Sequence, residues 1–133
     1  MDYCPRFIVL EGIDGSGKST LAARLAQWLR GQGQDVLLDR EPSDSPAGRE
    51  IRRRAAGNQP VSPQEELELF LDDRRHHVAH AIGPALSSGK WVVLDRYFFS
   101  TAAYQGARGL DPQAILEMNR HFAPEPEHVF LLD

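Results

Sequence analysis

The 133-residue sequence has little cysteine, no long apolar run and no excess of positive charge. Its single cysteine, Cys4, excludes a disulfide framework or a cysteine-based metal site within this chain. No apolar stretch approaches the roughly 20 residues of a transmembrane helix, and the apolar run 7–10 is too short for a signal peptide. The formal net charge of -4 argues against a nucleic acid polymer as main partner. We therefore expect a cytoplasmic protein without a membrane segment.

Apolar runs typical of buried strands alternate with helical patterns along the chain. The length and the 41% of hydrophobic residues fit one globular domain. The predicted strands are residues 7–10, 35–39, 91–94 and 129–132. The predicted helices are residues 18–32, 46–56, 62–88 with a break near Gly83 and Pro84, and 111–122. Strands separated by helices imply a parallel sheet covered on both faces, hence an α/β fold.

Three of the predicted helices carry specific residue patterns. The third should begin with Ser62 as N-cap, Pro63 in the first turn and Glu65 at the third helical position. His76 and His80 share a face of this helix, which we interpret as solvated rather than metal-binding because no third ligand is obvious. The basic run 52–54 is interpreted as helix surface. In the first helix, one stripe is expected to be buried: Leu21, Leu25, Trp28 and Leu29.

Residues 12–19 match the phosphate-binding pattern G-x-x-x-x-G-K-[ST] in full, between a predicted strand and a predicted helix. Glycine allows the backbone to approach phosphate oxygens, so that amide groups and the helix N-terminus face the anion. Lys18 is expected to reach the β- and γ-phosphates of ATP, and the Ser19 hydroxyl to bind Mg²⁺. The residues predicted to bind the donor nucleotide are Gly12, Ile13, Asp14, Gly15, Ser16, Gly17, Lys18, Ser19 and Thr20.

A P-loop enzyme also needs an acidic residue at the end of a neighbouring strand to hold the magnesium shell. Asp95 directly follows the apolar run 91–94 and is the preferred candidate. Asp133 also follows an apolar strand, but it has no adjacent arginine and ranks second. Arg96 could clamp an acceptor phosphate through two guanidinium donors. We therefore predict Lys18, Asp95 and Arg96 as catalytic residues.

Phe70 and Arg74 stand four residues apart, so both project from one face of the third helix. An aromatic ring beside a forked donor can stack on a base and bond its carbonyl edge. Taken alone, the pair would be better interpreted as a core phenylalanine beside a surface arginine.

Six segments in a fixed order resemble bacterial thymidylate kinase, a family of P-loop nucleoside monophosphate kinases. They are Leu10-Glu11-Gly12 through Thr20, Arg40-Glu41-Pro42, Phe70 with Arg74, Asp95-Arg96-Tyr97, Ser100-Thr101-Ala102-Ala103-Tyr104-Gln105-Gly106, and Phe130-Leu131-Leu132-Asp133. The resemblance implies a P-loop NTPase fold, a three-layer α/β/α sandwich with four parallel strands in this chain. It also implies a homodimer, because members of the family commonly pair through helix packing.

The resemblance assigns roles around the acceptor nucleotide. Phe70 would pack on thymine and Arg74 would bond its O4 atom. Thr101 and Gln105 would approach the base, and Tyr104 would close on the sugar where a ribose 2′-hydroxyl would sit. The remaining roles concern the sugar and the phosphate: Asp14 for the 3′-hydroxyl, Glu41 for the pocket wall, Arg52 and Arg96 for the 5′-phosphate.

The chain departs from the family pattern in two places. Many relatives have Gly-Gly-Thr where this chain has Ser43-Asp44-Ser45, which puts the local loop geometry in question. Members with an arginine inside the P-loop carry it at the position of Gly15, and the others supply basic residues from a mobile lid. We therefore expect residues 1–133 to be one kinase domain cut short before the lid, the adenine-contacting segment, a fifth strand and a C-terminal helix.

The predicted function is phosphoryl transfer from MgATP to dTMP, giving dTDP and ADP. Since the acceptor already offers an anionic oxygen, positioning and charge neutralisation suffice, without a strong base or covalent intermediate. Another P-loop nucleoside monophosphate kinase and a lidless nucleotide-binding domain without activity are the alternatives. A GTPase switch is disfavoured because no N-K-x-D guanine motif is present.

Overall fold

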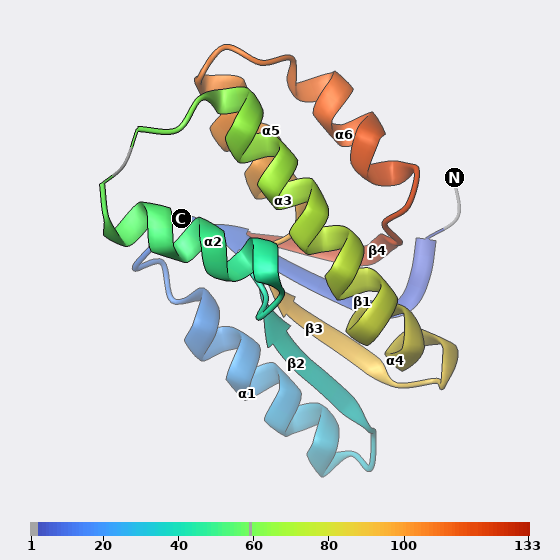
Figure 1. The fold of residues 1–133 in the computed structure, drawn as a ribbon. Helices are drawn as coiled ribbons and strands as arrows, with labels where there is room; N and C mark the ends of the chain where they lie inside the picture. Colours follow the sequence, from blue (N-terminus) through green and yellow to red (C-terminus); the bar gives the residue numbers. More distant parts are fainter. Residues whose placement is uncertain (1–2, 59) are drawn as a thin grey trace.

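The computed structural model describes residues 3–58 and 60–133, which form one parallel sheet with helices on both faces (Figure 1). The strands of these ranges are β1 (Tyr3–Gly12), β2 (Val36–Arg40), β3 (Trp91–Asp95) and β4 (Glu125–Leu132). Their order is β2-β3-β1-β4, and each neighbouring pair is parallel. The predicted α/β fold is therefore confirmed.

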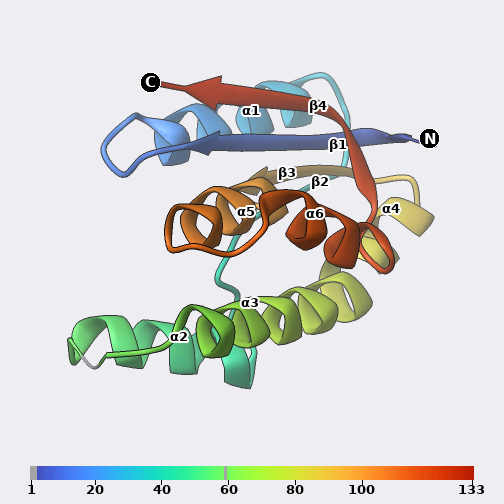
Figure 2. The same ribbon diagram turned by 90° about the horizontal axis from the view of Figure 1, so that it is seen from above.

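Helices lie on both sides of the sheet, as Figure 2 shows. They are α1 (Lys18–Gly31), α2 (Pro46–Ala56), α3 (Pro63–His77), the π-helical η1 (Val78–Ile82), α4 (Gly83–Ser87), α5 (Phe98–Ala107) and α6 (Pro112–Arg120). Helix α1 covers one face, while α5 and α6 lie between the other face and α3. None of the helices within the described ranges has the length and apolar character that crossing a bilayer requires.

Successive residues of β1 supply the cores of both faces. Phe7 and Val9 pack on the side of α4 and α5, whereas Ile8 and Leu10 pack against α1. All four are at most 6% exposed, so the predicted buried strand at residues 7–10 is confirmed. The two cores fix the carboxyl end of β1, from which the P-loop starts.

The predicted buried stripe of α1 is partly wrong. Leu29 is buried and Leu25 is packed on the core, but Leu21 and Trp28 are 42% and 61% exposed. The helix instead rests on Ala22 and Ala26. These small side chains let the helix approach the sheet closely, so the large neighbouring side chains are displaced to the flanks.

The start of α3 has the predicted form. Ser62 is the N-cap, its hydroxyl accepts from the amide of Glu65 at 3.1 Å, and Pro63 lies in the first turn. The break expected near Gly83 and Pro84 is a π-helical turn, η1, which joins α3 to α4 without interrupting the helical path. Since proline lacks an N–H, a local change of hydrogen bonding is the expected response.

Residues 98–107 form α5, a helix that is absent from the predicted elements. Its N-cap residue, Tyr97, provides no capping side chain. The Glu11 carboxylate at the end of β1 caps the helix instead, accepting from the amides of Tyr97 at 3.1 Å and Ser100 at 3.0 Å and from the Ser100 hydroxyl. Because this cap comes from a distant strand, the sequence next to the helix contains no signal for its start.

Candidate functional site

The P-loop leaves β1 at Gly12 and enters α1 at Lys18. Gly12 has a φ of 149°, and a Cβ there would lie 2.5 Å from the carbonyl oxygen of Leu132 in β4, so no other residue fits. Gly17 is the N-cap of α1 in the left-handed region, with a φ of 93°. The Lys18 ammonium donates to the carbonyl of Ile13 across the loop at 2.9 Å. This hydrogen bond thus links the two ends of the P-loop.

Ser19 and Asp95 meet beside the loop, as a shared magnesium shell requires. The Ser19 hydroxyl donates to Asp95 Oδ2 at 2.8 Å, although 76 residues separate the two. Two hard oxygen donors at the P-loop fit Mg²⁺, which takes few protein ligands and completes its octahedron with phosphates and waters. His76 and His80, by contrast, stack on each other with ring centroids 4.1 Å apart on an exposed helix face.

Two cavities lie side by side at the carboxyl ends of the strands. The smaller has about 390 Å³ and the larger about 580 Å³. Glu41 and Arg96 line both. The smaller cavity is lined by Asp14, Gly15, Gly17, Lys18, Ser19, Thr20, Arg40, Glu41, Asp95 and Arg96.

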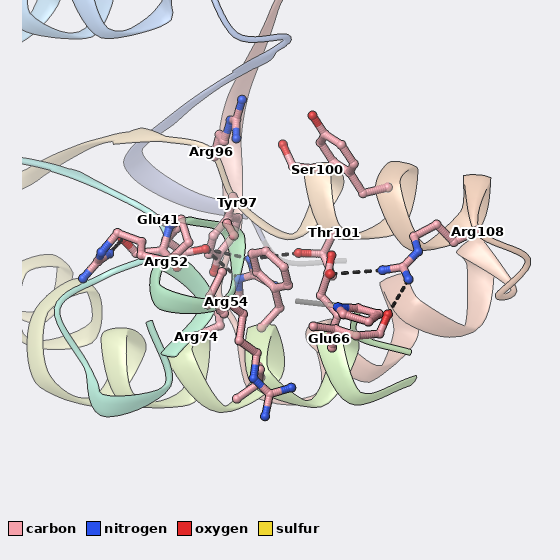
Figure 3. A pocket seen from close by; sticks show the side chains of 18 residues that line it. Glu41, Arg52, Arg54, Glu66, Arg74, Arg96, Tyr97, Ser100, Thr101 and Arg108 are labelled. Carbon is pink, nitrogen blue, oxygen red and sulfur yellow. Dashed lines mark hydrogen bonds and ion pairs between the residues drawn. The ribbon is translucent and has the colours of Figure 1, made fainter. Parts of the chain in front are cut away.

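The larger cavity brings together most of the residues predicted for the acceptor (Figure 3). These are Glu41, Arg52, Phe70, Arg74, Arg96, Thr101 and Tyr104. Gln105 does not line the cavity. It is fully buried, and its amide donates to Glu66 at 2.7 Å.

Arg96 lies at the boundary between the two cavities. Its backbone is in the left-handed region with a φ of 72°, and its amide donates to the carbonyl of Leu10 at 2.9 Å. Its guanidinium forms an ion pair with Asp14 of the P-loop. Arg96 is therefore linked directly to the P-loop.

Arg52 reaches the larger cavity from α2. Its guanidinium donates to the carbonyls of Pro42 and Ser43 at 2.8 and 2.9 Å and pairs with Asp44 at 3.1 Å. The loop that departs from the family pattern is thus the loop that orients Arg52.

Asp73 on α3 holds that loop in place. The hydroxyls of Ser43 and Ser45 donate to its Oδ1 atom at 2.5 and 2.6 Å, and the Ser43 amide donates to Oδ2 at 2.9 Å. Ser45 also caps α2 by accepting from the amide of Gly48. The two serines of this chain thereby give the loop a defined conformation.

Arg74 forms the buried wall of the larger cavity and is 1% exposed. It donates to Glu41 Oε1 through Nε at 2.9 Å and Nη2 at 2.7 Å, to Asn119 at 2.7 Å and to Thr101 at 3.2 Å. Its guanidinium also lies 5.3 Å from the ring centroid of Tyr97. These contacts fix its position without a ligand.

Three carboxyl and imidazole groups around the site have shifted pKa values. Burial alone would lower the pKa of His77, but hydrogen bonds to Asp39 and Glu41 outweigh it and raise that pKa to about 9. Burial alone would raise the pKa of Asp39, but the hydrogen bonds from His77 and from the Arg40 amide outweigh it, so the pKa is lowered. Burial raises the pKa of Glu11 despite its bonds from Ser100 and Tyr97.

Sequence reasoning missed several residues of this region. Arg40 lines the smaller cavity, and its place in the Arg40-Glu41-Pro42 segment was the signal that could have found it. Glu11 lies in another such segment, Leu10-Glu11-Gly12. Others make long-range contacts that no local sequence pattern predicts: Asp39, Glu66, Asp73, His77, Arg108 and Asn119.

Comparison with known proteins gives one family. The family model described as thymidylate kinase matches residues 10–133. The chain belongs to the thymidylate kinase family. It is 50% identical over 127 residues to a thymidylate kinase of Desulfotalea psychrophila, covering 96% of this chain and 62% of that protein. It is 49% identical to a probable thymidylate kinase of Thermococcus kodakarensis, covering 96% and 65%.

A solved thymidylate kinase has the same fold. The enzyme of Ehrlichia chaffeensis superimposes with a TM-score of 0.86 at 36% identity, covering 96% of this chain and 70% of that one. The chain thus spans less than two thirds of the length of the first two thymidylate kinase relatives.

Proposed function

We propose that the protein transfers the γ-phosphoryl group of ATP to dTMP, giving ADP and dTDP. The observation that carries this proposal is the pair of adjoining cavities that share Glu41 and Arg96. One cavity borders the P-loop and the other borders Phe70 and Arg74, so two nucleotides can meet end to end at Arg96. Membership of the thymidylate kinase family supports thymine as the acceptor base.

Each side of the site has a distinct task in this reaction. Lys18 and the P-loop amides would bind the donor phosphates, and Lys18 would exchange its bond to Ile13 for the β- and γ-phosphates. Arg96 and Arg52 would hold the acceptor phosphate, with Arg96 releasing Asp14 towards the sugar 3′-hydroxyl. Ser19 and Asp95 would hold Mg²⁺, which would neutralise charge on the donor phosphates.

The chemical step needs no protein base. An oxygen of the acceptor phosphate attacks the γ-phosphorus, and the bond from that phosphorus to the bridging oxygen of ADP breaks. Two anions that repel each other must be held in line, and Arg96 between the two cavities stands where their charges meet.

The base end of the larger cavity suits a thymine ring. Phe70 lines it as the ring predicted to stack on the base, and Arg74 as the donor predicted for O4. Tyr104, predicted to exclude a ribose 2′-hydroxyl, also lines the cavity. A homodimeric assembly stays a prediction from the family resemblance, and a cytoplasmic location stays a prediction from the sequence composition.

A coupled ADP-release assay on the full-length protein with dTMP, dUMP, UMP and AMP tests the proposal. We expect dTMP to give the highest kcat/KM, and UMP to be rejected at the sugar. Turnover of UMP or AMP equal to that of dTMP would assign the site to another monophosphate. Binding of ATP without ADP release for any acceptor would reduce the domain to nucleotide binding.

A further inference from the structure

A chain of alternating charges runs from β2 to the wall of the larger cavity. His77 on α3 places Nε2 2.9 Å from Asp39 Oδ2 and Nδ1 2.9 Å from Glu41 Oε2. The other oxygen of Glu41 accepts twice from Arg74. His77, Glu41 and Arg74 are each at most 5% exposed, whereas the Asp39 side chain is 36% exposed.

The two neighbouring carboxylates require the His77 ring to be positively charged. A carboxylate only accepts hydrogen bonds, so each ring nitrogen must carry a hydrogen, and only the imidazolium has two. A neutral ring would set a bare nitrogen against a buried carboxylate oxygen. The raised pKa of His77 agrees with this geometry. The series Asp39, His77, Glu41, Arg74 is then balanced, two anions alternating with two cations.

The buried carboxylate of Glu41 is stabilised by hydrogen bonds from protein side chains rather than by water. Its carboxylate is 2% exposed, and its two oxygens receive their side-chain donors only from Arg74 and His77 among the described residues. Loss of the His77 donors would leave one oxygen of a buried anion unpaired, and the carboxylate would move or take up a proton. Either response would disturb Arg74, which uses the opposite oxygen.

We infer that His77 is a positioning residue for the acceptor nucleotide, which fixes Glu41 and through it the guanidinium of Arg74. The inference rests on the proposed function, since it concerns the base end of the acceptor cavity. His77 itself does not line that cavity. Because Arg74 lines only the larger cavity whereas Glu41 lines both, the effect of His77 is expected mainly on the acceptor.

The first test compares H77Q with H80Q in the full-length protein. Glutamine can donate on one side only, so one carboxylate loses its donor. We expect H77Q to raise the KM for dTMP about 10- to 100-fold, with little change in the KM for ATP. H80Q is the matched control, because His80 is exposed on the continuation of the same helix, in η1, and outside both cavities. An unchanged KM for dTMP in H77Q would overturn the inference.

A rescue variant separates positioning from packing. In H77Q/E41Q the chain of hydrogen bonds can be rebuilt. The amide introduced at position 77 donates to Asp39 and accepts from the amide introduced at position 41, whose carbonyl still accepts from Arg74. We expect the KM for dTMP of the double variant to be about tenfold lower than that of H77Q. If the histidine only fills space, the second change would add damage, and that result would overturn the inference.

If H77Q does not fold, D39N is tested in its place. A substitution at Asp39 is expected to disturb folding less, because this side chain is partly exposed. We expect a rise in the KM for dTMP in the same direction and smaller, with no change for ATP; the absence of any rise would overturn the inference. If the wild-type protein prefers another monophosphate, the proposed function fails, and the same variants are assayed with that acceptor.

Discussion

Arg96 is the residue on which both halves of the site converge. It follows the carboxylate Asp95 at the end of β3, and its amide bond to Leu10 fixes it beside the start of the P-loop. Its left-handed backbone directs the side chain along the boundary of the two cavities. A side chain with a φ of 72° is strained unless surrounding contacts hold it, and these backbone contacts do so.

Replacement of Arg96 by alanine is expected to abolish most transfer. Without its donors the acceptor phosphate loses both alignment and charge neutralisation, so we expect kcat/KM for dTMP to fall about 100- to 1,000-fold. ATP affinity, measured by titration calorimetry, should change little because the P-loop is intact. R53A is the control, since Arg53 pairs with Glu50 and lines neither cavity. Near-normal turnover in R96A would remove Arg96 from the mechanism.

At the scale of elements, Glu11 joins the P-loop strand to α5. Its carboxylate caps the helix that carries Thr101 and Tyr104, and it stands directly before Gly12. The P-loop and one wall of the larger cavity are therefore connected by one buried side chain. Arg96 directly precedes Tyr97, whose amide donates to Glu11. The same contact therefore also helps to fix the position of Arg96.

E11A should loosen the start of α5. Removal of the Glu11 carboxylate leaves the Tyr97 amide unpaired and leaves the Ser100 amide only its longer bond to the Tyr97 carbonyl, at 3.2 Å. We therefore expect the free energy of unfolding to fall by about 1–3 kcal/mol. Hydrogen exchange should accelerate at these two amides. E127A on β4, an exposed carboxylate, is the control, and E11Q should cost less than E11A because it keeps an acceptor oxygen. Unchanged exchange at Tyr97 and Ser100 in E11A would contradict the assigned cap.

The same helix shows why part of the architecture could not be predicted. The strand β1, the P-loop and the start of α3 follow from periodicity and from local caps such as Ser62. Helix α5 was missed because its cap comes from Glu11, 86 residues before Tyr97. The stripe of α1 was misassigned because the close approach of Ala22 and Ala26 to the sheet decides which side faces it.

The residues of the candidate site also differ in whether the sequence could predict them. Lys18, Ser19 and Asp95 belong to patterns with strict spacing, and the structure brings them together. His77 and Asp73 lie in no such pattern, since their partners are 28 to 38 residues away in sequence. Side chains that orient others, rather than contact a ligand, need tertiary structure to be recognised.

At the scale of the whole molecule, the fold places two cavities at one edge of a parallel sheet. Strand β1 ends in the P-loop, β3 ends in Asp95 and Arg96, and the loop after β2 carries Glu41 (Figure 1). The Glu41 amide donates to the carbonyl of Asp95 at 3.0 Å, so the two loops are joined directly. These two cavities are proposed to hold a donor and an acceptor nucleotide at the same time.

Binding of a bisubstrate analogue tests this claim most directly. Adenosine and thymidine joined 5′ to 5′ through five phosphates would span both cavities, and its Kd for the full-length protein can be measured by calorimetry. We predict binding at least about 100-fold tighter than that of ATP or dTMP alone. This gain in affinity should be lost in R96A, and either nucleotide should block binding of the analogue. An affinity no higher than that of ATP alone, or binding that dTMP fails to block, would contradict the account.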